Sequence, residues 1–375
     1  MRLLSRASHF SVHVLSACRS RACFLCVCLL CVNLICACAP TASNRTPRQT
    51  SKEPARPMST REFLLDTLVT VTIYDKIDQD AARAATRAAM DEIARLESVL
   101  SAAAEDSDPA RLAINAGEDF IDVSEDTIYL LNEGARFSAI SAGAFDCTVG
   151  PLVALWSIRE SGGYYPTDAQ LKEALSLIDY QSVLIRGDNQ VMLMYPGMRL
   201  DFGAIAKGYI ADRVKTLLLA DGVKCGLIDL GGNIVLFGQK PDGAPFRVGA
   251  RDPYGVPGEY FGVFTVSDKS LVSSGSYERF FIHDGKAYHH IFDVSTGFPA
   301  DNELIQVTIV SDSSTEGEGY STAAFLLGLE WGMALVGKAD GIEAVFVTKD
   351  KQVYITSGIK DQFEITSDEY KLASL

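Results

Sequence analysis

The chain has 375 residues, of which 47% are hydrophobic and 22% are charged, a mixture typical of globular proteins. Its formal net charge is −14, and the part after residue 37 carries −18 because residues 1–37 contain four arginines and no acids. Such an acidic body repels nucleic acids and anionic lipid headgroups, which excludes both as its main ligands. A ligand rich in phosphate needs a cation or a helix N-terminus beside it.

The N-terminal segment has the pattern of a bacterial secretion signal. Arginines precede an apolar run at Ala22–Ala37, which is shorter than the roughly 20 residues of a membrane-spanning helix. Seven of the nine cysteines lie at residues 18–38, where no histidine or carboxylate accompanies them in the apolar run. The run ends in Ile35-Cys36-Ala37-Cys38, which is similar to a lipobox, so we expect lipidation of Cys38 and anchoring at the periplasmic face of the inner membrane. A plain cleaved signal peptide is the alternative.

Domain boundaries follow from composition. Residues 39–60 are rich in Pro, Ser, Thr, Arg and Lys, and they hold almost no large apolar side chains with which to form a core. We therefore expect a signal at residues 1–37, a flexible tether at 38–60 and one folded domain at 61–375.

Strand and helix patterns alternate along this domain. Enrichment in Val, Thr and Ile predicts a strand at Phe63–Tyr74, and an alanine-rich amphipathic pattern predicts a helix at Asp80–Leu100. Ser124 is a typical N-cap for a helix that ends near Ile140. The later elements are a hairpin of Ser182–Ile185 and Val191–Tyr195, a helix at Ala204–Leu219, strands at Gly226–Phe237, Phe246–Ala250, Phe261–Val266, Phe280–Ile282 and Leu304–Val310, a helix at Thr322–Gly337 and two short closing strands. Because strands outnumber helices and several form hairpins, we expect an α+β fold with mixed sheets and packed helices.

The segment Leu200–Tyr209 places small residues where a strand turns into a helix. Gly203 and Ala204 allow a ligand close to the backbone, and the helix N-terminus offers N–H groups and partial positive charge to a phosphate. Lys207 adds a cation one turn into the helix. The spacing is not that of a Walker A loop, and an ordinary strand–turn–helix with a surface lysine explains the segment equally well.

Two adjacent histidines form the next candidate group. In a strand, the side chains of His289 and His290 point to opposite faces, so at most one of them faces a site. No cysteine or third histidine accompanies them at a spacing suited to a metal. A general base near neutral pH is the functional interpretation, and a hydrogen-bonded structural histidine is the alternative.

Two glycine-rich or acidic segments complete the candidates. Ile228–Asn233 contains a glycine pair that a tight turn or a β-bulge explains as well as a ligand does. Glu318 and Thr322 are expected at the start of the last long helix, one turn apart, where both oxygens could reach one hard cation. A helix cap with an acid in the first turn is the alternative.

Six segments in one order resemble the FAD:protein FMN transferases, formerly called thiamine-biosynthesis lipoproteins. The resemblance covers residues 62–345 and is specific because the segments occur together in register. They are Phe145–Leu152, Leu200–Tyr209, Asp229–Asn233, Ser273–Arg279, His290–Gly297 and Ser321-Thr322.

The resemblance implies an FAD-binding enzyme that uses Mg²⁺. FMN is transferred to a Thr or Ser hydroxyl of a membrane-bound electron-transport subunit, and AMP leaves. It implies that His290 is the base, that Leu65, Ala103, Ala144, Phe145, Asp146, Asp201, Lys207 and Ile291 contact FAD, and that Ala204, Glu318, Ser321 and Thr322 hold the metal.

Three positions depart from the family pattern. Glu318 stands where the family has an aspartate, and Leu65-Asp66-Thr67 stands where Met-Gly-Thr is expected. The segment Ser101–Ala104 has three alanines where an aromatic side chain commonly covers the flavin, which predicts hydrolysis of FAD to FMN and AMP beside transfer. An FAD pyrophosphatase without a protein acceptor and a flavin-binding lipoprotein without turnover are therefore the alternative functions.

Overall fold

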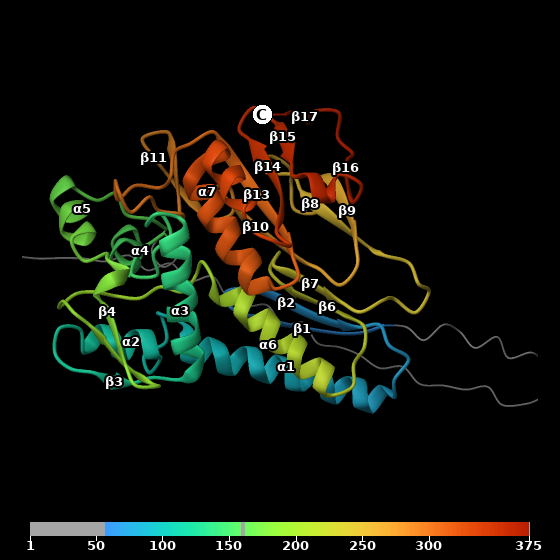
Figure 1. The fold of residues 1–375 in the computed structure, drawn as a ribbon, viewed down its shortest axis with the longest axis horizontal. Helices are drawn as coiled ribbons and strands as arrows, with labels where there is room; N and C mark the ends of the chain where they lie inside the picture. The colour runs from blue at the N-terminus through green and yellow to red at the C-terminus, as the bar shows by residue number, and fades with distance from the viewer. Residues whose placement is uncertain (1–56, 159–161, 375) are drawn as a thin grey trace, which may run out of the picture. The chain divides into compact units, whose positions relative to one another are not determined.

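The computed structural model describes residues 57–158 and 162–374 (Figure 1). The predicted signal, nearly all of the predicted tether and the predicted lipidation site Cys38 lie outside the described residues. The helices are α1 (Gln79–Leu100), α2 (Asp108–Ile114), α3 (Glu125–Ile140), α4 (Gly150–Trp156), α5 (Asp168–Leu175), α6 (Ala206–Ala220) and α7 (Ser314–Val336). The strands are β1 (Met58–Leu64), β2 (Thr67–Ile73), β3 (Ile121–Asp122), β4 (Val183–Arg186), β5 (Gln190–Leu193), β6 (Gly226–Leu230), β7 (Ile234–Phe237), β8 (Phe246–Arg251), β9 (Tyr260–Val266), β10 (Ser270–Gly275), β11 (Phe280–His283), β12 (Lys286–His289), β13 (Leu304–Ser311), β14 (Glu343–Thr348), β15 (Gln352–Ile355), β16 (Phe363–Ile365) and β17 (Lys371–Leu372).

The main sheet has the strand order β1-β2-β6-β7-β10-β13-β14-β15-β17. Its pairs are antiparallel except for β15 with β17. Smaller sheets have the orders β16-β9-β8, β3-β5-β4 and β11-β12. The expected α+β fold of mixed sheets with packed helices is confirmed.

Strand β13 marks the centre of the folded domain. All eight of its residues are buried, which shows that both faces of the main sheet are covered there. Helix α7 packs on one face against β10 and β13. The other face shares a second apolar core with the β16-β9-β8 sheet, to which Leu236, Phe261, Phe264 and Val345 contribute.

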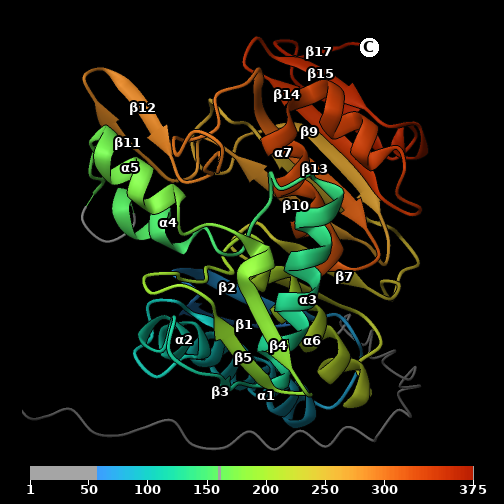
Figure 2. The same ribbon diagram turned by 60° about the vertical axis from the view of Figure 1, so that its left-hand side comes forward.

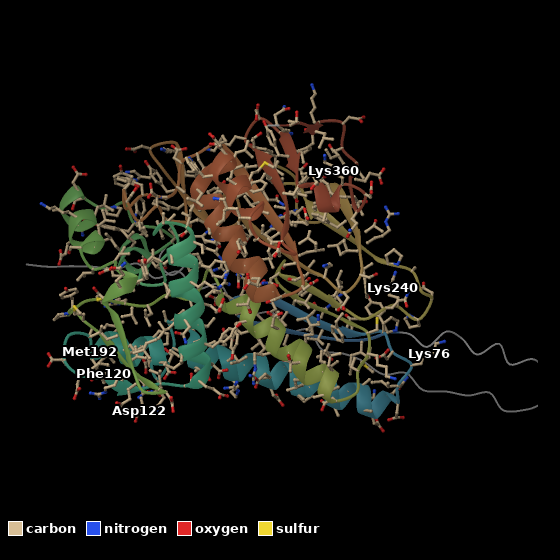
Figure 3. The ribbon with its side chains drawn as sticks, in the orientation of Figure 1. Lys76, Phe120, Asp122, Met192, Lys240 and Lys360 are labelled. Carbon is tan, nitrogen blue, oxygen red and sulfur yellow. The ribbon has the colours of Figure 1, made fainter. Side chains whose placement is uncertain are left out.

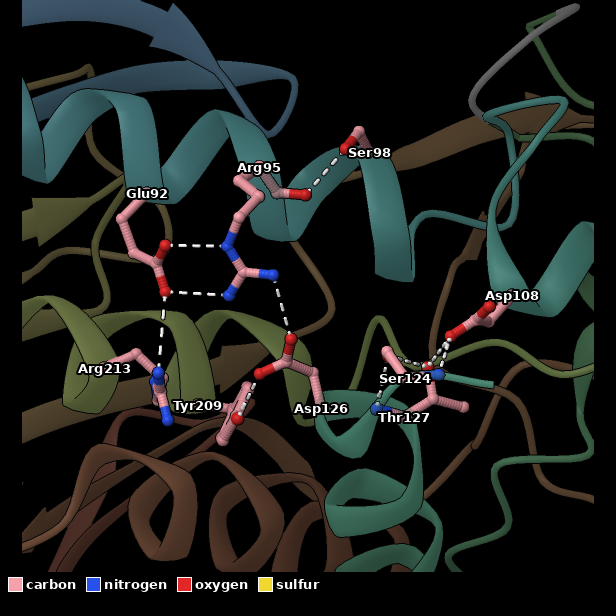
Figure 4. Close-up of polar contacts among 9 residues, drawn as sticks. All are labelled: Glu92, Arg95, Ser98, Asp108, Ser124, Asp126, Thr127, Tyr209 and Arg213. Carbon is pink, nitrogen blue, oxygen red and sulfur yellow. Dashed lines mark hydrogen bonds and ion pairs between the residues drawn. The ribbon is translucent and has the colours of Figure 1, made fainter. Parts of the chain in front are cut away.

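Helices α1, α3 and α6 are joined by a buried polar network (Figure 4). Asp126 at the start of α3 is 2% exposed. It accepts hydrogen bonds from Arg95 Nη1 on α1 at 3.0 Å and from Tyr209 Oη on α6 at 2.6 Å. Arg95 also binds Glu92 through two nitrogens, at 2.8 and 2.9 Å. Because a buried charge is stable only when paired, this network fixes how the three helices pack.

An aromatic cluster connects α4 to the β11–β12 hairpin, which lies beside α4 and α5 in both views (Figure 2). Trp156 at the end of α4 is fully buried, and its Nε1 donates to the carbonyl of Gly297 at 2.8 Å. Its ring lies against the rings of Tyr165, Phe281, Tyr288, Phe292 and Phe298. The other tryptophan, Trp331 on α7, is 68% exposed.

The small β3-β5-β4 sheet supports helix α2. Figure 3 places Phe120, Asp122 and Met192 at this sheet, where the Arg186 guanidinium lies 4.0 Å from the centroid of the Phe120 ring. Helix α2 contacts β5, and Gly117 N donates to the Leu193 carbonyl at 2.8 Å just after α2. The sheet thereby holds α2 in place.

Several sequence-based expectations are confirmed. The helices expected at Asp80–Leu100 and from the N-cap Ser124 are α1 and α3, and Ser124 Oγ accepts a hydrogen bond from Thr127 N. The hairpin expected between residues 182 and 195 is β4–β5. Within the described ranges, no helix has the length and apolar character needed to cross a membrane.

Two expected single strands are hairpins instead. Phe63–Tyr74 contains the turn Leu65-Asp66, whose φ angles of 55° and 56° match the twist of a two-residue hairpin. Non-glycine residues rarely adopt this conformation, so Leu65-Asp66 was not recognisable as a turn. Strand β1 also begins at Met58, within the stretch expected to be tether. Gly226–Phe237 is likewise the β6–β7 hairpin, and Gly231 and Gly232 form its turn.

Helix α7 begins at Ser314, well before the expected start at Thr322. Glycines mark loops in sequence, but Gly317 and Gly319 lie inside the first turns of α7 because neighbours leave no room for a side chain. A Cβ at Gly317 would meet Ser311 and Val272, and a Cβ at Gly319 would collide with the ring of Phe137. Helices α2, α4 and α5 and strands β3, β10 and β12 were not expected, and more than two strands follow α7.

Candidate active site

One large cavity brings most of the predicted site residues together. Its volume is about 1350 Å³, above the roughly 300–1,000 Å³ of common small-molecule sites. Leu65, Ala103, Ala144, Phe145, Asp146, Asp201, Ala204, Lys207, His290, Ile291, Glu318 and Thr322 all line it, whereas Ser321 does not. A second cavity of about 60 Å³ beside Cys147 is too small for a nucleotide.

Asp146 is held by the turn that precedes α4. Its Oδ1 accepts from Thr148 N and Oγ1, both at 2.7 Å, and its Oδ2 accepts from Tyr180 N at 3.0 Å. Burial raises the pKa of Asp146, and these hydrogen bonds oppose the rise. The carboxylate therefore shapes the cavity wall by fixing two segments. Phe145 beside it is 2% exposed and packs on Phe137.

The segment before α6 forms the floor of the cavity. Asp201 N donates to the carbonyl of Cys147 at 2.8 Å, and Asp201 Oδ1 accepts from Gly203 N at 2.7 Å. These bonds set the turn that leads through Ala204 into α6. A Cβ at Gly208 would collide with the carbonyl of Ser314, so glycine there lets the first turn of α6 lie against α7.

Glu318 lies where α6 and α7 meet. It is 3% exposed, its Oε1 lies 2.6 Å from Lys207 Nζ, and its Oε2 accepts a hydrogen bond from Gly208 N. Thr322, one turn further along α7, also faces the cavity. The two residues share a helix face as expected, although they lie within α7 and not at its start.

Ser274 on β10 is a site residue that sequence reasoning missed. Its Oγ lies 2.9 Å from Ser321 Oγ and 3.2 Å from Thr322 Oγ1, and it lines the cavity. Ser321 is fully buried and donates to the Glu318 carbonyl at 2.9 Å. The motif around Ser274 was visible in the sequence, but its contact with α7 depends on long-range packing.

Glu318, Thr322 and Ala204 line the same cavity and offer a carboxylate, a hydroxyl and a backbone carbonyl. Oxygen ligands of these kinds are those that Mg²⁺ prefers. In residues 57–158 and 162–374, no three His, Cys, Asp or Glu side chains cluster as a metal site would require. The oxygen set of Glu318, Thr322 and Ala204 is therefore the candidate, with Ser321 behind it.

The two histidines have different environments. His290 lines the cavity just beyond β12, and its Nδ1 lies 3.2 Å from the Arg279 carbonyl, to which it donates. That bond leaves Nε2 with a free lone pair. Burial lowers the pKa of His290 to about 3, so the ring is neutral at pH 7. His289 is 8% exposed, its Nε2 donates to the Ala300 carbonyl, and its Nδ1 accepts from Ile291 N.

Further charged residues line the cavity that were not assigned a role from the sequence, although Glu278 and Arg279 lie in the segment Ser273–Arg279. They include Glu97, Glu105, Arg199, Arg251, Glu278 and Arg279. Burial raises the pKa of Glu278, and the positive charge of Lys207 is the largest effect that opposes this rise. Glu278 and Glu318 therefore both lie within electrostatic reach of Lys207.

Exposed small and apolar side chains form part of the cavity lining. Ala103 is exposed in the loop after α1, and Ile114 on α2, which also lines the cavity, is 77% exposed. Leu65 lies in the β1–β2 turn, where its N–H donates to Glu97 Oε1 at 2.9 Å. Ser101–Ala104 contains no aromatic residue, so this segment covers its side of the cavity only with small side chains.

Comparisons with known proteins agree on one family. A family model described as the ApbE family matches residues 65–346. The FAD:protein FMN transferase of Treponema pallidum is 37% identical over 331 residues, which cover 84% of this chain and 91% of that protein. The protein of the same name from Klebsiella pneumoniae is 36% identical, with 75% of this chain and 87% of that protein covered.

Solved structures show the same likeness. The ApbE protein of Thermotoga maritima superposes with a TM-score of 0.76 at 28% identity, covering 82% of this chain and 99% of that one. The flavin transferase ApbE of Vibrio cholerae superposes with a TM-score of 0.73 at 26% identity, covering 82% and 100%. The chain therefore belongs to the ApbE family, to which these flavin transferases belong, and the resemblance seen in its six segments is confirmed.

Proposed function

We propose that this chain transfers the FMN part of FAD to a hydroxyl group of an acceptor protein and releases AMP. The observation that carries the proposal is that one cavity holds His290, Lys207 and the Glu318–Thr322 pair beside the first turn of α6. The related proteins named FAD:protein FMN transferase supply the substrate class.

The reaction follows from these groups. The acceptor hydroxyl oxygen attacks the FMN phosphorus, its proton passes to His290 Nε2, and the bond from that phosphorus to the bridging oxygen breaks. AMP carries away the bridging oxygen. Lys207 and the N–H groups at the start of α6 offset the charge of the phosphates.

We assign Mg²⁺ to Glu318, Thr322 and the Ala204 carbonyl, with Ser274 orienting the Thr322 hydroxyl and Ser321 bonded to Ser274 behind it. The bound ion supplies Lewis-acid stabilisation of phosphate charge. Glu318 has one methylene more than the aspartate expected at this position, which changes the reach of the carboxylate by about 1.5 Å.

The acceptor belongs outside the cytoplasm in this proposal. The N-terminal signal pattern and the lipobox-like ending support lipidation of Cys38, placement at the periplasmic face of the inner membrane and a membrane-bound electron-transport subunit with a Thr or Ser as acceptor. Cys38→Ala should abolish partitioning of the full chain into detergent. Unchanged partitioning would mean that Cys38 does not carry the anchor and that the lipobox interpretation is wrong.

One experiment separates the candidate functions. The chain is incubated with FAD, Mg²⁺ and an acceptor domain containing a Thr, and both the nucleotides and the protein mass are measured. We expect AMP together with an FMN adduct on the acceptor, and loss of both with EDTA or Glu318→Gln. Full turnover in EDTA would remove the metal from the proposal, and free FMN without any adduct would make the chain a pyrophosphatase.

A further inference from the structure

The Glu318 carboxylate has a partner for each of its oxygens. Lys207 Nζ lies 2.6 Å from Oε1, and Gly208 N–H donates to Oε2. The carboxylate is nearly inaccessible to solvent, and a buried charge requires such partners. A divalent ion that binds Oε1 while Lys207 stays in place would lie a few Å from the ammonium, and the two positive charges would repel each other.

The Lys207 side chain is free enough to move, and a second carboxylate lies in the same cavity. The side chain of Lys207 is 35% exposed, whereas that of Glu318 is 4% exposed. Lysine is a point charge on a flexible four-carbon stem, so it can move while the carboxylate stays fixed by Gly208. Glu278 lines the same cavity as Lys207 and offers a second carboxylate there.

We propose that Lys207 is an exchangeable internal cation, which holds Glu318 in the metal-free protein and moves toward Glu278 and the substrate phosphates when a divalent ion arrives. The inference rests on the proposed metal role of Glu318. It makes Lys207 a positioning residue with two states, and it means that the metal and the lysine compete for one carboxylate. Metal affinity in the absence of substrate is then held low by the protein itself.

The test measures Mn²⁺ binding to the full chain without FAD, from the loss of the spectrum of free Mn²⁺ in electron paramagnetic resonance. Lys207→Met should bind Mn²⁺ at least about tenfold more tightly than wild type, because a like charge a few Å away is removed from a poorly hydrated site. Lys207→Arg keeps the charge and should retain weak binding. Lys215→Met, which removes a lysine of α6 paired with Asp268, is the matched control and should bind as wild type does.

Folding is checked in the same samples. Without metal, Lys207→Met leaves Glu318 buried and without its cation, so the thermal midpoint of this variant should be lower than that of wild type. Mn²⁺ should then raise the thermal midpoint of Lys207→Met by more than it raises that of wild type. Glu278→Gln should weaken Mn²⁺ binding in wild type by more than it does in the Lys207→Met background, since there the exchange has already been removed.

The outcomes separate this inference from the metal site itself. If Glu318→Gln abolishes binding but Lys207→Met binds no more tightly than wild type, the metal site stands and the exchange is wrong. If Glu318→Gln binds Mn²⁺ as wild type does, the metal site and the exchange both fail. Equal effects of Glu278→Gln in both backgrounds would remove Glu278 as the second partner and overturn the two-state form of the proposal.

Discussion

His289 and His290 are neighbours in sequence but do different work in the structure. Only His290 has a ring nitrogen with a free lone pair at the cavity, and a positioned base contributes roughly 10²–10⁴-fold to rate. His290→Gln should lower kcat by about that range with little change in FAD binding. His289→Gln should lower thermal stability instead, since it removes the bonds to Ala300 and Ile291. Equal losses of kcat in both variants would contradict the assignment.

The lowered pKa of His290 gives folding a defined dependence on pH. Between the usual histidine pKa of about 6.5 and a folded pKa of about 3, the unfolded chain binds a proton here that the folded chain does not. Stability must therefore fall as the pH is lowered through this window. The thermal midpoint of His290→Gln should fall less steeply over the same window, and parallel curves would contradict the burial of the ring.

Site residues that lie in a short motif could be recognised from the sequence. Residues that reach the site only through long-range packing could not. Glu318 and Thr322 were recognisable because a helix places residues one turn apart on one face. His290 was recognisable because histidines are rare in this chain. Ser274 and Glu278 reach the cavity only because β10 pairs with β13 and lies under α7. No local pattern encodes that contact.

Helices α1, α3 and α6 depend on one buried carboxylate for their relative placement. Tyr209→Phe removes the 2.6 Å hydrogen bond to Asp126 and leaves that oxygen of a 2% exposed group unsatisfied. We expect a loss of about 1–3 kcal/mol in the free energy of unfolding, measured by denaturant titration. Tyr260→Phe is the control, because Tyr260 is 54% exposed, and its effect should stay within about 0.5 kcal/mol. A loss equal to that of the control would mean that the network does not stabilise the packing.

Helix boundaries were predictable where a capping side chain marks them. They were not predictable where backbone conformation alone interrupts the helix. Ser124 caps α3 as expected. Helix α7 contains a break at Gly328, where φ is 77° and ψ is −179°, a conformation that only glycine adopts readily. Glu303 accepts the freed Leu329 N–H at 2.6 Å, and Asn302 donates to the Phe325 carbonyl at 2.7 Å. Since both partners precede β13 in sequence, the break has no local signature beyond the glycine.

The balance between transfer of FMN and hydrolysis of FAD depends on the size and lining of the whole cavity. Its volume exceeds that of common ligand sites, and three alanines form part of its rim. Ala103→Tyr should cover the flavin, exclude water and lower the ratio of free FMN to protein-bound FMN. Ala220→Tyr, at the exposed end of α6 away from the cavity, should leave that ratio unchanged. If wild-type protein releases no free FMN over hours with Mg²⁺, the hydrolytic activity is absent.

The fold class could be predicted from the sequence, but the strand order could not. The excess of strands over helices and the adjacent strands that read as hairpins favoured an α+β fold over a doubly wound arrangement. The order of the main sheet instead depends on β10 inserting between β7 and β13. That pairing joins residues far apart in sequence, and it places the Ser274 segment against α7.

Because the chain has only two tryptophans, its own fluorescence can count occupied sites. Trp156 lies fully buried with its ring 5.9 Å from that of Phe292, a residue of the cavity wall. Tryptophan emission overlaps flavin absorption, so excitation of Trp156 passes to a flavin bound nearby. Trp331 is open to solvent and contributes background that iodide quenches. Trp331→Phe would leave one emitter whose dimming follows flavin entry and departure in real time, without an attached dye.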